Sequence, residues 1–221
     1  MISGSYKAAI FDFDGTIVDS FPGIAKSIRY ALKMTRGEEV RELESLKKFV
    51  GPPLRDSFIT SLGMNEDEIN EAIHHFRERY GNVGFRECEI FEGIIETLSE
   101  IRGNGIKTAL ASSKAEDMLK KITDDKNLTQ YFDVILGVSD NLKHKSKADI
   151  IMSAMHKLSV LPQETVMIGD RMYDAEGAKT AGVAFIGALY AGYGSREEFN
   201  DYPYILLSEN IEEIKTAILC R

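Results

Sequence analysis

The sequence predicts an α/β fold in which a parallel sheet, covered by helices on both faces, is interrupted after its first strand by a helical insertion. Three observations support this. Residues 7–12 are almost entirely apolar, which is typical of a strand buried on both faces. Residues 21–89 show only helical spacing of apolar positions. From residue 91 onward, short apolar runs alternate with amphipathic segments, which is the pattern of a parallel sheet.

The insertion is expected to contain four helices. Pro22 is tolerated in the first turn of the first helix, and Gly-Pro-Pro at 51–53 ends the second. A third helix is expected over 54–62, and Asn65 can cap the fourth. The apolar positions at helical spacing are Ile24, Ile28, Ala31 and Leu32 in the first helix, Val40, Leu43, Leu46 and Val50 in the second, and Ile69, Ile73, Phe76 and Tyr80 in the fourth.

The rest of the chain is expected to alternate between helices and strands. Expected helices cover 94–101, 116–122, 149–158, 173–181 and 211–219. Expected strands cover 107–111, 132–136, 165–168, 184–187 and 205–207. Because the first strand is of the same buried type as the later ones, the predicted division is a core domain of residues 1–19 and 91–221, with a helical cap domain at 20–90.

Composition excludes several classes of protein. Of 221 residues, 43% are hydrophobic and 28% are charged, and the net charge of −8 comes with no run of basic residues. A surface for nucleic acid or acidic membranes is therefore not expected. Cys88 and Cys220 stand far apart, which argues against a disulfide framework or a zinc site. Asp12 and Asp14 interrupt the first apolar run, so it is read as neither a signal peptide nor a membrane span. We expect a cytoplasmic protein.

Polar motifs follow the predicted strands. In open α/β sheets, ligands bind beyond the carboxyl ends of the strands, so residues at these positions are expected to converge. The motifs are Asp12-Phe-Asp14-Gly-Thr16 after the first strand, Ser112-Ser113-Lys114 after the second, Gly169-Asp170 with Asp174 after the strand that ends near 168, and a lysine-rich stretch at 143–147.

These residue types suit phosphate chemistry. Four carboxylates (Asp12, Asp14, Asp170 and Asp174), without matching histidines or thiolates, favour a hard cation such as Mg²⁺. A metal ion and a lysine would lessen the repulsion between an anionic phosphate and an anionic nucleophile. Of two aspartates two residues apart, one can attack phosphorus while the other transfers a proton. Asp14-Gly15 alone would also suit a hairpin turn, but the motifs at the other strand ends favour a site.

In this combination and order, the motifs resemble those of the haloacid dehalogenase superfamily. The resemblance implies a Rossmann-like core with a helical cap. It implies Asp12 as nucleophile and metal ligand, and Asp14 as the acid/base that also binds metal through its backbone carbonyl. Asp170 would bind magnesium, with Asp174 as a ligand or a neighbour of one. The phosphate-binding set would comprise Thr16, which supports the loop, with Ser112, Ser113 and a lysine.

The lysine of that set has two candidates. Members with the pattern Lys-Pro-x-Pro-Asp would align Lys145, but this chain lacks both prolines. Other members place the lysine two residues before the acidic start of the helix, which selects Lys147. We favour Lys147 and keep Lys145 as the alternative.

Within the superfamily, three segments resemble the phosphoglycolate-phosphatase-like branch, some of whose members are 5′-nucleotidases. They are Gly-Pro-Pro-Leu at 51–54, Gly-Asp-Arg at 169–171 and Gly-Tyr-Gly-Ser-Arg-Glu at 192–197. The resemblance implies a phosphatase of a small phosphate ester. We expect a monomer or a homodimer. The alternatives are a 5′-nucleotidase, a β-phosphoglucomutase-like phosphosugar mutase, and a non-catalytic binding protein on the same scaffold.

Overall fold

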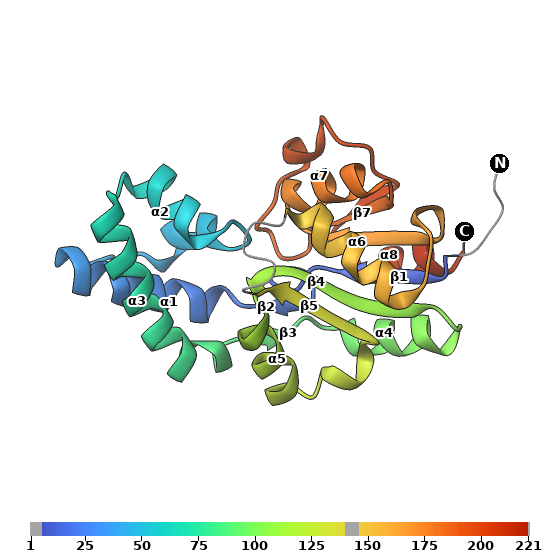
Figure 1. The fold of residues 1–221 in the computed structure, drawn as a ribbon, viewed down its shortest axis with the longest axis horizontal. Coiled ribbons are helices and arrows are strands. Elements are labelled where there is room, and N and C mark those ends of the chain that lie inside the picture. Colours follow the sequence, from blue (N-terminus) through green and yellow to red (C-terminus); the bar gives the residue numbers. More distant parts are fainter. Residues whose placement is uncertain (1–5, 140–145, 221) are drawn as a thin grey trace. The chain divides into compact units, whose positions relative to one another are not determined.

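The computed structural model describes residues 6–139 and 146–220 of the protein (Figure 1). The chain forms two compact units. One comprises Met1–Val18 with Ile90–Arg221, and the other comprises Asp19–Glu89. The chain passes between the units at a two-stranded sheet of β2 (Val18–Asp19) and β3 (Glu89–Ile90). The second unit is thus an insertion between the first strand and the remainder of the first unit.

The first unit is built on a six-stranded sheet. The strand order is β5-β4-β1-β6-β7-β8, and every neighbouring pair is parallel. The strands are β1 (Ala8–Phe11), β4 (Lys107–Ala115), β5 (Val134–Val138), β6 (Thr165–Gly169), β7 (Ala184–Ala188) and β8 (Leu206–Ser208). All four residues of β1 are buried, as the short apolar run predicts for a central strand. The predicted parallel α/β fold is confirmed.

Helices cover both faces of this sheet (Figure 1). The helices α6 and α7 pack on one face, and α4, α5 and α8 lie on the other. Their bounds are α4 (Ile94–Gly103), α5 (Glu116–Asp125), α6 (Lys147–Leu158), α7 (Met172–Ala181) and α8 (Ile211–Leu219), with short 3-10 helices η3 (Thr129–Tyr131), η5 (Pro162–Glu164) and η6 (Arg196–Phe199). The apolar side chains buried between the layers fix the sheet, so that the ends of its strands can hold a site.

The inserted unit contains three α-helices rather than four. They are α1 (Phe21–Arg36), α2 (Leu54–Leu62) and α3 (Glu66–Asn82), accompanied by 3-10 helices η1 (Leu43–Phe49) and η2 (Gly84–Arg86). The expected second α-helix is replaced by η1. The chain leaves α1 through Gly37, which has a φ of 67°, and buried Leu46 and Phe49 then recur three residues apart. That spacing matches the three residues per turn of a 3-10 helix.

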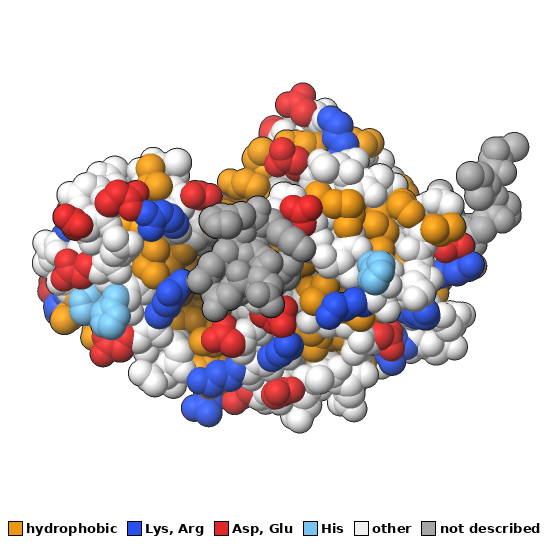
Figure 2. Space-filling view, viewed as in Figure 1, with side chains coloured by type: hydrophobic (Ala, Val, Ile, Leu, Met, Phe, Trp, Pro, Cys, Tyr) orange, Lys and Arg blue, Asp and Glu red, His pale blue; other side chains and the backbone are white. Residues whose placement is uncertain are grey.

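Two observations describe the surface of the molecule. Among the described residues, no helix is long and apolar enough to cross a lipid bilayer. Figure 2 shows Lys and Arg side chains interspersed with Asp and Glu over the visible face, rather than gathered into one basic surface.

The helices α1 and α3 are joined by a bidentate ion pair. Arg36 donates from Nε and Nη2 to the two carboxylate oxygens of Glu68, at 2.8 and 2.9 Å. Glu68 also completes the capping box of α3 with Asn65. The hydrogen bond from Arg36, and then the backbone hydrogen bond from Asn65, lower the pKa of Glu68 to about 2.

Glu68→Gln is therefore expected to lower the free energy of unfolding at pH 7. A carboxyl whose pKa is depressed by folding stabilises the fold above its unfolded value, and this contribution is lost as pH falls through the folded value. The deficit should be constant above about pH 5 and shrink as pH falls toward 2. Urea denaturation across this range measures it. Glu71→Gln, at an exposed position of α3, is the control, and an equal deficit there would contradict the assignment.

Candidate active site

The candidate site lies at the carboxyl ends of three adjacent central strands. Phe11, the last residue of β1, is in register with Leu110 of β4 and Ile168 of β6. Asp12 follows Phe11 directly, and its backbone N–H donates to the Ile168 carbonyl at 2.9 Å. Asp170 follows β6. Residues that are far apart in sequence therefore reach one edge of the sheet, as expected for a parallel fold.

Three buried carboxylates meet at this edge. Asp12, Asp170 and Asp174 each offer an oxygen, and these atoms all lie within 4.8 Å of one another. Burial, opposed by Lys147 and reinforced by the neighbouring carboxylates, raises the pKa of Asp12 to about 6. Burial and the charges of Asp174 and Asp12 raise the pKa of Asp170 well above its usual value. The cluster therefore favours a nearby positive charge.

Lys147 supplies one such charge. Its Nζ lies 2.8 Å from Asp12 Oδ1 and 2.7 Å from Asp174 Oδ1, and all three side chains are buried. Burial acts to lower the pKa of this lysine, but Asp12 and Asp174 outweigh it and the pKa is raised, so the lysine stays charged. The alternative candidate, Lys145, lies outside the described residues.

The start of α6 explains this placement. The helix was expected to begin near residue 149, but it begins at Lys147, because Ser146 forms a capping box with Asp149. Lys147 is thus a residue of the first helical turn rather than of a loop. Gly177 of α7 accommodates its side chain, since a Cβ there would come within 2.8 Å of Lys147 Cγ.

The acidic cluster also suits a magnesium ion. Within the described part of the chain, neither carboxylate oxygen of buried Asp170 has a hydrogen-bond partner, and the same is true of Asp14 Oδ1. Buried polar atoms normally have partners, so these oxygens are open to a ligand. The available donors are oxygens, which Mg²⁺ prefers over sulfur or nitrogen.

A glycine allows the first loop to approach this cluster closely. Gly15 has a φ of 81°, and a Cβ on it would lie 2.2 Å from Asp170 Oδ2. Thr16, one residue further, is fully buried. Its carbonyl accepts a hydrogen bond from the hydroxyl of Tyr190, which follows β7, so the loop after β7 helps to fix this loop.

Asp14 has a partner that the sequence did not suggest. Its Oδ2 lies 2.9 Å from Lys114 Nζ, and both side chains are about nine-tenths buried. The carboxylate of Asp14 is thus turned to Lys114 and is not a member of the cluster of Asp12, Asp170 and Asp174. Lys114 was placed from the sequence in the motif after the second predicted strand but was assigned no chemical role, although a cation two positions after a candidate phosphate-binding serine was already a signal.

The second motif lies inside a strand rather than after it. The strand β4 was expected to end at residue 111, but it continues to Ala115, with a register shift between Ala111 and Ala115 against β5. An irregularity of this kind redirects side chains at the end of a strand. Ser112 is buried, and its Oγ accepts from the Lys114 N–H at 3.4 Å. Ser113 is half-buried beside it.

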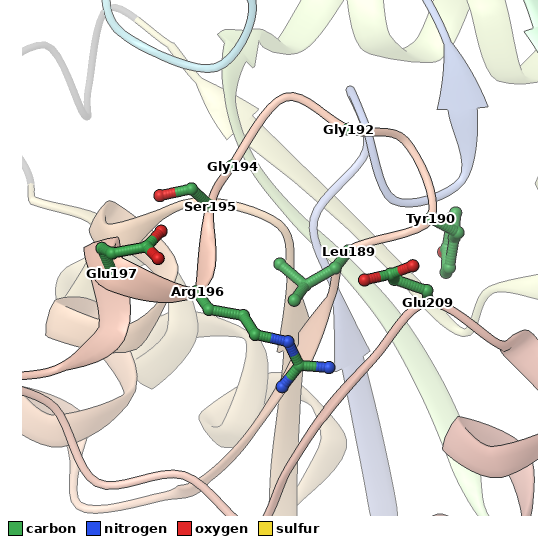
Figure 3. Close-up of a pocket in the computed structure, with 8 residues that line it drawn as sticks. All are labelled: Leu189, Tyr190, Gly192, Gly194, Ser195, Arg196, Glu197 and Glu209. Atoms are coloured by element: carbon green, nitrogen blue, oxygen red, sulfur yellow. The ribbon is translucent and has the colours of Figure 1, made fainter.

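The loop after β7 borders the site and contains a pocket of about 490 Å³. A Cβ on Gly194 of this loop would lie 2.0 Å from the Asp170 carbonyl, so glycine is required for the close approach. In the pocket, Glu209 points toward Leu189, whereas Ser195 points away from it (Figure 3). The Gly-Tyr-Gly-Ser-Arg-Glu segment of the sequence therefore lies next to the site.

Comparison with known proteins places the chain in one family. The haloacid dehalogenase-like hydrolase family matches residues 9–188. The chain is 34% identical over 217 residues to the tyrosine-protein kinase PtkA of Mycobacterium tuberculosis, covering 97% of this chain and 73% of that protein. It is 34% identical over 193 residues to a 5′-nucleotidase of Pseudomonas aeruginosa, covering 87% and 86%.

Two further similarities concern phosphatases. The chain is 26% identical over 215 residues to phosphoglycolate phosphatase 1 of Pseudomonas aeruginosa, covering 94% of this chain and 78% of that protein. The crystal structure of a predicted phosphatase from Clostridium acetobutylicum superposes with a TM-score of 0.90 at 35% identity, covering 97% of this chain and 99% of that one.

Proposed function

The chain belongs to the haloacid dehalogenase-like hydrolase family and is a phosphatase, and from this premise we propose that it is a magnesium-dependent phosphomonoesterase with Asp12 as nucleophile. The observation that carries the proposal is the position of Asp12. Its carboxylate is buried at the end of the central strand, 2.8 Å from Lys147 and next to two further carboxylates. An anionic nucleophile held beside a cation is suited to attack a phosphate.

The proposed reaction has two steps. In the first, an oxygen of Asp12 forms a bond to phosphorus as the bond to the leaving oxygen breaks, which gives a phospho-aspartate. Asp14 transfers a proton to the leaving oxygen. In the second step, water attacks phosphorus with Asp14 accepting its proton, and inorganic phosphate and free Asp12 result. Lys114, 2.9 Å from Asp14, fixes the position of that acid/base.

The remaining residues are proposed to bind the phosphate and the metal ion. Lys147 and Ser112 would hold the phosphate oxygens, with Ser113 and Thr16 shaping the same surface. Asp12, Asp170, Asp174 and the Asp14 carbonyl would hold magnesium. When bound, magnesium would neutralise negative charge on the phosphate and so ease attack by a carboxylate.

Within this proposal we favour a small phosphorylated metabolite, as in the phosphoglycolate-phosphatase-like branch. A 5′-nucleotidase is the second candidate, and it is supported by a relative of that name at 34% identity. Phosphate release from a panel of phosphoglycolate, nucleoside 5′-monophosphates and sugar phosphates tests both. Conversion of a sugar 1-phosphate into the 6-phosphate would instead indicate a mutase, and absence of any turnover would indicate a binding protein.

Removal of divalent metal is expected to abolish phosphate release, and added magnesium should restore it. Without a cation, the three buried carboxylates repel an incoming phosphate. The measurement is phosphate release before chelation, after chelation and after addition of excess Mg²⁺. The control is the circular dichroism spectrum, which should be unchanged throughout. Undiminished turnover in the chelator would contradict the proposed metal site.

A further inference from the structure

The inserted unit has a pocket of its own. It has a volume of about 420 Å³, and all of the residues that line it lie between 26 and 79, on α1, α3 and the segment that follows α1. Among the lining residues, five cationic side chains face two anionic ones. Glu87, which pairs with Lys26 and Arg79, brings the local excess to two positive charges. The cationic residues are Lys26, Arg29, Lys33, Arg41 and Arg79.

This positive charge is a local feature. The inserted unit as a whole has 11 Lys and Arg residues against 13 Asp and Glu, and the full chain has a net charge of −8. By its overall composition, the inserted unit is therefore slightly acidic. The concentration of cations around one cavity creates a positive potential that attracts anions.

Two of the arginines are available for a ligand. Lys26 and Arg79 share Glu87, at 3.1 and 2.9 Å, and Lys33 lies 3.7 Å from Glu39. Arg29 and Arg41 are both exposed, and neither makes an ion pair or a hydrogen bond with any residue that the structure describes. Their guanidinium groups can therefore bind an anion without breaking an existing contact.

We propose that this pocket binds a small polyanion that carries phosphate groups. Guanidinium groups match phosphate oxygens with two parallel hydrogen bonds, and an excess of two positive charges suits a ligand with more than one negative charge. The volume is that of a small-molecule site. The phosphate group can belong to a substrate of the enzyme or to a separate ligand, and the chemistry of the pocket is the same for both.

Inorganic pyrophosphate is the probe for this site. Its binding to the full-length protein is measured by titration calorimetry in buffer freed of metal ions on a chelating resin. Arg29→Gln and Arg41→Gln should each weaken binding about tenfold, because each removes a charge-assisted contact. Arg77→Gln is the matched control, since Arg77 is exposed on α3 and does not line the pocket. It should bind as the wild type does.

Three outcomes would overturn the proposal: no saturable binding, equal weakening in the Arg77→Gln protein, or binding that is lost in Asp12→Asn but kept in Arg29→Gln and Arg41→Gln.

A second experiment, run with magnesium in excess over pyrophosphate, distinguishes a substrate phosphate from a separate ligand. Inhibition of phosphate release that disappears in Arg29→Gln and Arg41→Gln assigns the site to the substrate, and binding without inhibition assigns it to a separate ligand. Because binding is measured without turnover, failure of the proposed phosphatase reaction would leave this result unaffected.

Discussion

Asp12→Asn is expected to lower phosphate release by at least about 10³-fold, because an amide oxygen cannot replace a carboxylate that forms a covalent bond to phosphorus. The substitution keeps the size of the side chain, so the buried edge of the sheet should remain packed. Initial rates with the best ester of the panel, at saturating magnesium, measure the effect. The loss should appear in kcat, since the carboxylate acts in the chemical step.

The control for this experiment is Asp56→Asn, an exposed aspartate of α2. It makes the same chemical change outside the site and should retain wild-type activity. Circular dichroism and thermal unfolding of both variants establish that the fold is intact. Full activity of a folded Asp12→Asn protein would remove Asp12 from the role of nucleophile.

Lys147→Met is expected to reduce both stability and activity. The lysine is 7% exposed in its side chain and is the cation between Asp12 and Asp174. Its removal leaves buried carboxylates without a counter-charge, and loss of one partner of a buried ion pair typically costs about 3–5 kcal/mol. Activity should fall by about 10²-fold or more, because a positive charge beside the reacting phosphate is lost. Urea denaturation and initial rates measure the two effects.

Magnesium provides a sharper test of the same variant. Because a ligand that binds only the native state stabilises it, magnesium should restore part of the lost stability of Lys147→Met. The increment on adding magnesium should be larger than in the wild type, where Lys147 already offsets the carboxylates. Lys157→Met, exposed in the last turn of α6, is the control and should behave as the wild type. Wild-type stability and turnover in Lys147→Met would exclude this role.

Helix starts show where local sequence signals were sufficient and where they were not. Asn65 was predicted to cap a helix and does so, because its side chain acts within one turn. The Ser146 cap was not anticipated, and the helix that it starts begins two residues earlier than expected. That difference decides whether Lys147 is a solvated loop residue or a buried one, because the first helical turn lies against α7 and the end of β1.

The sequence by itself determined the parallel fold, the inserted helical unit, and the placement of Asp12, Asp170 and Asp174 at one edge of the sheet. These features follow from hydrophobic periodicity and from the rule that parallel strands end at a common edge. Only the tertiary structure decided which cation pairs with which carboxylate. Lys147 reaches Asp12 across 135 positions of sequence, and the Asp14 carboxylate pairs with Lys114 and lies outside the cluster of Asp12, Asp170 and Asp174. Such pairs depend on side-chain directions and on where each strand and helix ends, and hydrophobic periodicity does not encode either to within one residue.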